Sequence, residues 1–103
     1  MNKQEFTGRM VADPQLRTVG DKQVCSFRMA VRTRGANTQD AFINCEAWGK
    51  PAETIARYAT KGKMLGVVTN LKQHSYEKNG VKITVDDFVV EDFDLLDKKP
   101  EEA

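Results

Sequence analysis

The sequence predicts an all-β domain that contains one short helix. Three observations lead to this prediction: apolar and polar residues alternate over most of the chain, turn-forming residues separate the alternating segments, and only one segment begins like a helix. At 103 residues the chain is long enough for one domain with a modest core. Its apolar fraction of 40% and charged fraction of 30% are typical of a globular protein.

Three segments in the first half of the chain alternate in this way and are expected to be strands: residues 3–11, 23–34 and 40–50. The first is ended by Ala12-Asp13-Pro14, and a turn follows at Val19-Gly20-Asp21-Lys22. Successive side chains of a strand point to opposite faces, so each segment should have one apolar, inward face. The expected inward residues are Phe6, Gly8, Met10, Cys25, Phe27, Met29, Val31, Ile43, Cys45 and Ala47.

A short helix is expected over residues 51–60. Pro51 suits the first turn of a helix, where its missing N–H costs nothing. Lys61 and Gly62 are typical of a helix end, as a cation near the C-terminus and a left-handed cap. The inner side of this helix should carry Ile55, Ala56 and Ala59.

Two further strands are expected, from about Lys63 and from about Val81 to Asp94, joined by the hairpin turn Glu77-Lys78-Asn79-Gly80. In the first of them, Leu65, Val67, Thr69 and Leu71 should point inward. In the second, the alternation slips between Val85 and Phe88, which predicts a β-bulge there.

The order strand-strand-strand-helix-strand-strand is that of the OB-fold, a five-stranded Greek-key barrel with its helix between strands three and four. The face of its second and third strands commonly binds oligonucleotides or oligosaccharides. We expect one OB-fold domain over residues 1–96 and a short disordered C-terminal end at 97–103.

Two large aromatic side chains lie on the polar face of the third strand. Phe42 and Trp48 share that face with Asn44 and Glu46. Aromatic residues at such positions need a partner element or a ligand, and the bases of a single-stranded nucleic acid are one such ligand. The alternative is that Phe42 and Trp48 cover a second small core or a subunit interface.

Basic and aromatic residues together occupy the outer faces of the second, third and fourth strands. Cations can follow a phosphate backbone while aromatic rings stack on bases, each stack being worth ~1–3 kcal/mol. The sequence therefore predicts a surface for single-stranded nucleic acid, with Trp48, Phe42 and Tyr76 stacking on bases. The predicted phosphate and backbone contacts are Arg28, Arg32, Arg34, Lys50, Lys72, Lys78, Lys3, Arg9 and His74.

The charge distribution favours the same interpretation. Residues 1–85 contain 14 Lys and Arg against 7 Asp and Glu, whereas residues 86–103 contain 2 against 8. A basic body with an acidic end is typical of a polyanion-binding domain. The alternative is that these charges only keep both parts in solution.

Catalysis is not expected. His74 is the only histidine, and no Ser or Cys has the surroundings of a nucleophile. Cys25 and Cys45 with one His do not form a zinc set, Asp86-Asp87 lacks further metal ligands, and no phosphate-loop spacing occurs. We therefore predict no enzyme activity, no metal and no cofactor.

The sequence predicts a cytoplasmic protein. No apolar run approaches the roughly 20 residues of a membrane span, and the N-terminus lacks the apolar region of a signal peptide. Cys25 and Cys45 fall on inward positions, which indicates buried free thiols in a reducing compartment. No membrane association is expected.

Several short motifs occur in an order and spacing that resemble those of one protein family. They are Asn2-Lys3, Gly8-Arg9, Ala12-Asp13-Pro14, Leu16-Arg17, Phe42-Ile43-Asn44-Cys45, Trp48-Gly49-Lys50, Ala52-Glu53, Tyr58-Ala59-Thr60-Lys61-Gly62, Tyr76 and Asn79-Gly80. Over about residues 1–96 the chain resembles the bacterial and phage single-stranded DNA-binding proteins (SSB). The resemblance implies an OB-fold that binds single-stranded DNA without strong sequence preference during replication, recombination or repair, either nucleoid-associated or phage-encoded. It also places base-stacking aromatics at Phe42, Trp48 and Tyr76, and it implies a homo-oligomer, with a tetramer favoured over a dimer.

The chain departs from the family pattern at three places. The loop Arg34-Gly35-Ala36-Asn37 lacks an aromatic residue common there, which predicts weaker binding or a shorter footprint. In the family, the first strand is apolar and pairs between subunits. Here polar residues, Gln4, Glu5 and Thr7, replace apolar ones, which weakens the expectation of a tetramer. The family's acidic tail with a Pro-Phe tip does not occur before Ala103: either the chain is truncated, or it is a variant without that route, and recruitment of replication and repair proteins by such a tip is not expected.

A related group suggests an alternative function. The length also suits the primosomal replication protein B family, which are tail-less dimeric OB-folds that bind single strands and helicase-loading partners. The block from Phe42 to Gly62 fits the single-stranded DNA-binding proteins better. Base stacking by itself does not distinguish DNA from RNA.

Overall fold

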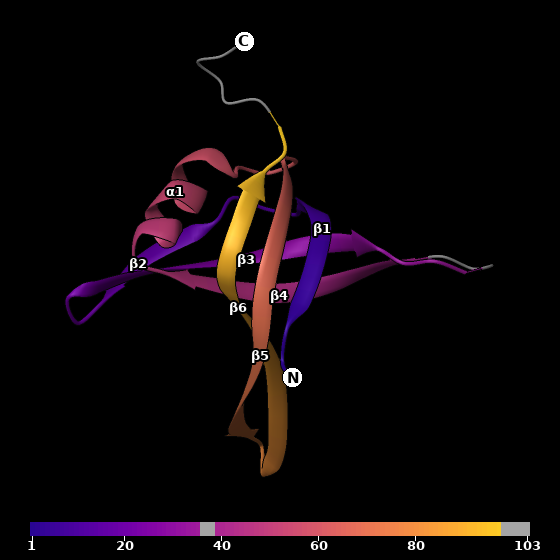
Figure 1. Ribbon diagram of the computed structural model, residues 1–103. Coiled ribbons are helices and arrows are strands. Elements are labelled where there is room, and N and C mark those ends of the chain that lie inside the picture. The colour runs from indigo at the N-terminus through magenta and orange to yellow at the C-terminus, as the bar shows by residue number, and fades with distance from the viewer. Residues whose placement is uncertain (36–38, 98–103) are drawn as a thin grey trace.

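The computed structural model describes residues 1–35 and 39–97, which form strands and a single helix (Figure 1). In chain order the elements are β1 (Gln4–Met10), β2 (Gln15–Val19), β3 (Lys22–Arg32), β4 (Asp40–Trp48), α1 (Lys50–Tyr58), β5 (Met64–Lys78) and β6 (Val81–Leu95). No helix in this part of the chain has the length and apolar character needed to cross a membrane.

The strand pairings form a closed ring. β1 pairs with β5 and with β3, β3 pairs with β4, β4 pairs in parallel with β6, and β6 pairs with β5. In Figure 1, β1, β5 and β6 run across β3 and β4, so the two groups of strands face each other. The predicted fold class, an all-β OB-fold with one helix before its fourth long strand, is confirmed.

One strand was not expected from the sequence. β2 forms a hairpin with β3, and the predicted break at Ala12-Asp13-Pro14 separates it from β1. All five residues of β2 are exposed, so the strand has no apolar face that could reveal it in the sequence. The structure therefore has six strands where five were predicted.

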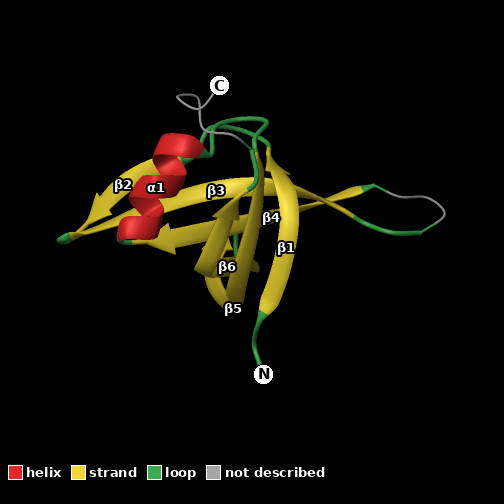
Figure 2. Cartoon of the chain, turned by 45° about the horizontal axis from the view of Figure 1, so that its top comes forward, coloured by secondary structure: helices red, strands yellow, loops and turns green. Residues whose placement is uncertain are grey.

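The core lies between the crossed strands and is closed at one end by α1, which contacts β2, β3 and β4 (Figure 2). The predicted inward residues are buried or half-buried, and Thr69 is a buried polar residue. Partly buried Phe6 and Phe88 meet edge to face with ring centres 5.2 Å apart, a favourable aromatic geometry. The buried core residues are Met10, Cys25, Phe27, Met29, Cys45, Ala47, Ala52, Ile55, Ala59, Leu65 and Val67.

The helix α1 begins one residue before its predicted start, with Pro51 in its first turn, and it ends two residues earlier than predicted. The N–H of Ala59 donates to the carbonyl of Ile55 at 2.9 Å and closes the last turn. Gly62 has a φ of 89°, so the predicted left-handed glycine is confirmed beyond the helix end.

The hairpin of β5 and β6 extends well beyond the body of the molecule (Figure 1). At its tip, Asn79 and Gly80 have φ values of 53° and 78°, the left-handed pair that a two-residue hairpin turn needs. We call the projecting part, residues 72–87, the arm. Every residue from Lys72 to Lys78 is exposed.

A β-bulge interrupts the β5–β6 pair, but its predicted position is wrong. The register is continuous between Val85 and Phe88, and it shifts instead between Val68 and Thr69, which leaves Glu91 without a partner in β5. The slip in alternation has another cause: Phe88 packs against the core, whereas Val85 lies on the opposite face of the arm, where there is no core.

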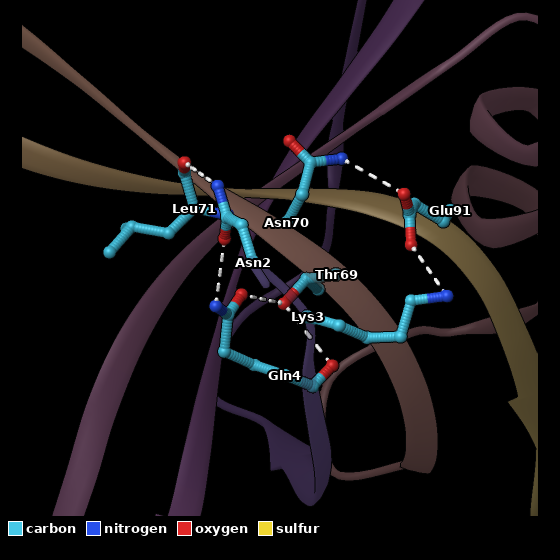
Figure 3. Close-up of polar contacts among 7 residues, drawn as sticks. All are labelled: Asn2, Lys3, Gln4, Thr69, Asn70, Leu71 and Glu91. Carbon is cyan, nitrogen blue, oxygen red and sulfur yellow. Dashed lines mark hydrogen bonds and ion pairs between the residues drawn. The ribbon is translucent and has the colours of Figure 1, made fainter.

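Polar contacts around this bulge hold the start of the chain against β5 (Figure 3). The side-chain amide of Asn2 donates to the Leu71 carbonyl at 2.9 Å and accepts from the Leu71 N–H at 2.8 Å. The hydroxyl of buried Thr69 donates to the side-chain oxygen of Gln4 at 3.0 Å. Glu91 accepts from Asn70 at 3.5 Å, so the unpaired residue of the bulge has polar partners.

The chain end expected to be disordered, residues 97–103, lies outside the described residues except for Asp97. The Asp97 carboxylate accepts a hydrogen bond from the Met64 N–H at 2.7 Å.

Candidate nucleic-acid interface

The outer face of β4 presents two aromatic side chains to solvent. Phe42 is 53% exposed and Trp48 is 39% exposed, whereas Cys45 and Ala47 on the other face are buried. The predicted division of this strand into an apolar inner face and an aromatic outer face is therefore confirmed. Trp48 follows Phe42 by six residue steps along the strand, which corresponds to about 20 Å.

A cation lies beside the first of these rings. Arg28 on β3 is opposite Asn44 on β4, and its guanidinium carbon is 5.1 Å from the centre of the Phe42 ring. This distance is within the range of a cation–π contact. The contact brings together one predicted phosphate-binding residue and one predicted stacking residue.

The arm carries a second aromatic group. Lys72, His74 and Tyr76 alternate on one face of β5, and Tyr76 is 47% exposed. The rings of His74 and Tyr76 are nearly parallel, with an interplanar angle of 26° and centres 6.3 Å apart. Nδ1 of His74 lies 2.5 Å from Oδ2 of Asp87 on β6, which fixes the orientation of the imidazole.

An open groove of about 700 Å³, which we call the central groove, is lined by the cation of the first group and the imidazole of the second, but not by Phe42, Trp48 or Tyr76. It runs over the outer faces of β2, β3 and β4 to the base of the arm. Both Arg28 and His74 line it, so two predicted site residues that are far apart in sequence share one surface. The polar and charged lining residues are Asp13, Gln15, Arg17, Ser26, Arg28, Asn44, Glu46, His74 and Asp87.

A second hollow, of about 520 Å³, lies at the other end of β4. Trp48 and the predicted phosphate contact Lys50 line it, with Lys22 and Gln23 from the start of β3. The structure therefore places a predicted cation beside each of the two aromatic residues of β4.

The remaining predicted cations are distributed over other parts of the surface. Arg9 and Arg32 line a hollow with Asp40, and Arg9 donates to the Gly62 carbonyl at 2.8 Å. Lys3 forms an ion pair with Glu91 at 3.5 Å, as Figure 3 shows. Neither Lys3 nor Arg9 lines the central groove.

Three predicted cations lie near the ends of strands or on the arm. Lys72 is opposite Asp87 in the β5–β6 pair, and Lys78 ends β5 next to the hairpin turn. Arg34 is exposed just beyond the end of β3. In the loop predicted to lack an aromatic residue, Ala36 and Asn37 lie outside the described residues.

The sequence did not indicate Arg17 as a site residue. Arg17 is exposed on β2 and lines the central groove beside Arg28 and Ser26. Its position depends on the hairpin of β2 with β3, and β2 has no alternating pattern that would have predicted that hairpin.

Cys25 and Cys45 are buried free thiols, as predicted. Burial raises the pKa of the Cys25 thiol to about 11 and that of the Cys45 thiol to about 12, so both are protonated at neutral pH. Over residues 1–35 and 39–97, no group of three or more His, Cys, Asp or Glu side chains is arranged to hold a metal ion.

The closed ring of strands and the helix between β4 and β5 define an OB-fold protein, and the β3–β4 surface is the one on which this class binds its ligands. Within that class, the chain belongs to the single-strand binding protein family, whose model matches residues 1–96.

Similar proteins carry the name of that family. The chain is 39% identical to a single-stranded DNA-binding protein of Enterococcus faecalis, over 96% of this chain and 56% of the relative. It is 41% identical to one of Clostridium perfringens, over 94% of this chain and 67% of the relative. Single-stranded DNA-binding protein 1 of Streptococcus pyogenes is 35% identical, over 99% of this chain and 82% of that protein. The chain thus spans between about half and four fifths of these relatives.

A solved structure has the same fold. It is described as a Plasmodium falciparum SSB complex with single-stranded DNA, and it superposes with a TM-score of 0.86 over 94% of this chain and 96% of its own. The identity is 18%, so the similarity supports the fold alone.

Proposed function

We propose that this chain binds single-stranded DNA without strong sequence preference and protects it during replication, recombination or repair. The observation that carries the proposal is that three large aromatic side chains, Phe42, Trp48 and Tyr76, are 39–53% exposed on strands that also carry cations. Contact between large apolar rings and water is unfavourable, and stacking on bases would remove part of that ring surface from water. Membership of the single-strand binding protein family supports the same function.

Each group of residues has a proposed role. Bases stack on the three aromatic rings, and the phosphate path crosses the central groove rim at Arg28 and Arg17. Lys50 extends the path beside Trp48, and His74 and Lys72 extend it along the arm. Further contributions come from the remaining predicted cations, which are Arg32, Arg34, Lys78, Lys3 and Arg9.

The proposed activity is binding alone. The chain acts without catalysis, metal or cofactor, in the cytoplasm, on the nucleoid or on phage DNA within a host cell. Stacking and ion pairing hold the strand in a single-stranded form and cover its bases.

We also propose that the chain forms a homo-oligomer, with a tetramer favoured over a dimer. β1 pairs with β5 from Gln4 to Arg9 but with β3 only from Gly8 to Met10. The edge of β1 before Gly8 is thus open to a strand of a second copy, because an exposed strand edge has unpaired N–H and C=O groups. Light scattering of the wild type and of Glu5→Ile tests this: we expect an oligomer in both, with a larger tetramer fraction in the variant. A monomer in both would contradict it.

Fluorescence anisotropy of a labelled oligo(dT) tests the DNA-binding function. We expect binding at low salt, weaker binding as salt increases, and a log–log slope of about −0.7 for each phosphate neutralised. A duplex of the same length should bind much more weakly, because its bases are not available for stacking. An absence of binding at low salt by folded protein would favour the alternative, an OB-fold of the primosomal type that acts mainly through protein partners.

A further inference from the structure

The central groove contains one carboxylate that has no partner within the described part of the chain. Three acidic side chains line it. Asp13 accepts a hydrogen bond from the Lys61 N–H at 2.8 Å, and Asp87 is paired with His74. For the third, Glu46, no hydrogen bond or ion pair occurs with any other residue of 1–35 and 39–97.

Glu46 lies in the middle of the proposed binding surface. It is on the outer face of β4, between Trp48 and Asn44, and opposite Ser26 on β3. Its side chain is half-buried in the groove wall. A strand that stacks on both Phe42 and Trp48 has to pass over it, because these rings are at the two ends of the same face.

The charge of Glu46 decides which part of the nucleic acid faces it. A carboxylate repels a phosphate, and the cations Arg17 and Arg28 are available for phosphates on the same groove. The bases of the bound strand should therefore point toward Glu46.

An ionised carboxylate accepts hydrogen bonds and cannot donate them. Cytosine, adenine and guanine each offer an exocyclic amine, and Glu or Asp is a usual acceptor for the cytosine N4 amine. Thymine has no exocyclic amine, and its one donor, N3–H, lies between two carbonyl oxygens that would repel the carboxylate.

We propose that Glu46 gives this surface a preference for bases with an exocyclic amine, cytosine first, over thymine. The inference rests on the proposed binding of single-stranded DNA, and it adds a base preference to a surface that otherwise binds by stacking and charge.

Competition binding with oligo(dC), oligo(dA) and oligo(dT) of equal length tests the proposal in the wild type, in Glu46→Gln and in Asp94→Asn. The amide introduced by Glu46→Gln keeps the shape of the side chain but can donate to thymine O4, so the ratio of dC to dT affinity should fall about fivefold. Asp94→Asn removes one negative charge from β6, outside the central groove, and should leave the ratio unchanged. The ratio within each protein removes the general effect of charge, and the comparison of that ratio between proteins removes the intrinsic stacking difference between the homopolymers.

Two results would overturn the inference, and they differ in what they say of the proposed function. If all three proteins bind the oligonucleotides with the same dC to dT ratio, the base preference is wrong and the binding function stands. If the folded wild type binds none of the three oligonucleotides at low salt, the binding function is wrong and the base preference fails with it.

Discussion

The guanidinium of Arg28 lies 5.1 Å from the centre of the Phe42 ring, across the pair of strands β3 and β4. The contact keeps an exposed aromatic ring and a cation side by side on the outer surface. A second contact of this kind occurs elsewhere: Arg57 lies 5.3 Å from the centre of the Tyr58 ring in α1. The two arginines have similar surroundings, but only Arg28 lies on the proposed binding surface, so they form a matched pair for mutation.

Arg28→Ala should weaken the binding of oligo(dT) and reduce the magnitude of the log–log salt slope by about 0.7, because one phosphate contact is lost. Arg57→Ala removes the same charge and should change neither quantity by a comparable amount. Anisotropy titrations at several salt concentrations measure both. Equal effects of the two substitutions would mean that only the total charge of the protein matters.

Tyr76→Ala should weaken binding by the energy of one stack, ~1–3 kcal/mol, without lowering the stability of the fold. The physical reason is that Tyr76 is 47% exposed on the arm, away from the core. Val81→Ala is the control, since Val81 is 61% exposed on the same hairpin and is not aromatic. A comparable loss of affinity in Val81→Ala would show that the arm does not act through its aromatic ring.

Gly8→Ala should destabilise the protein by about 1–3 kcal/mol, because the added carbon has no space. A Cβ at Gly8 would lie 2.5 Å from the carbonyl oxygen of Ala30, at the pairing of β1 with β3 that closes the ring of strands. Gly66→Ala is the matched control, since its nearest contact would be the Leu96 side chain at 3.8 Å. Urea unfolding measures both variants, and a Gly8→Ala protein as stable as Gly66→Ala would contradict the proposed closure.

The stability of the protein should decrease in alkali because of its buried thiols. The pKa of the Cys45 thiol is raised by burial from 9.0 to about 12, so the folded state favours the protonated form. The resulting stabilisation is fully present below pH 9 and is lost as the pH rises toward 12. Above about pH 9, the free energy of unfolding of the wild type should therefore fall relative to that of Cys45→Ala. The fall should be up to about 1.4 kcal/mol per pH unit. Urea unfolding of both proteins at several pH values from about 8 to about 10.5 measures the difference between their free energies of unfolding. The contributions of the other titrating groups cancel in this difference because both proteins contain them. A difference that stays constant over this range would contradict the prediction.

The outer faces of the long strands could be predicted from the sequence because each strand has a core on only one side. Cys45 and Ala47 are buried while Phe42 and Trp48 are exposed, and this contrast is already visible in the alternation of the residues. The hairpin turn at Asn79-Gly80 was equally predictable, because those residues tolerate positive φ values.

Features that depend on pairing between distant residues could not be predicted in this way. Asp87 meets His74 only because of the register of β5 with β6, and Arg17 reaches the central groove only because β2 pairs with β3. The change of apolar face before Phe88 looked like a bulge in the sequence, but it marks the point where the arm leaves the core.

The most direct test of the account uses Trp48, the single tryptophan of the chain, as a probe of the proposed surface. Oligo(dT) is added to the folded protein at low salt while the indole fluorescence is recorded, and salt is then added. Stacking of a base on Trp48 predicts saturable quenching that salt reverses. Unchanged Trp48 fluorescence at saturating oligo(dT), with the protein folded, would contradict the claim that this surface binds single-stranded DNA.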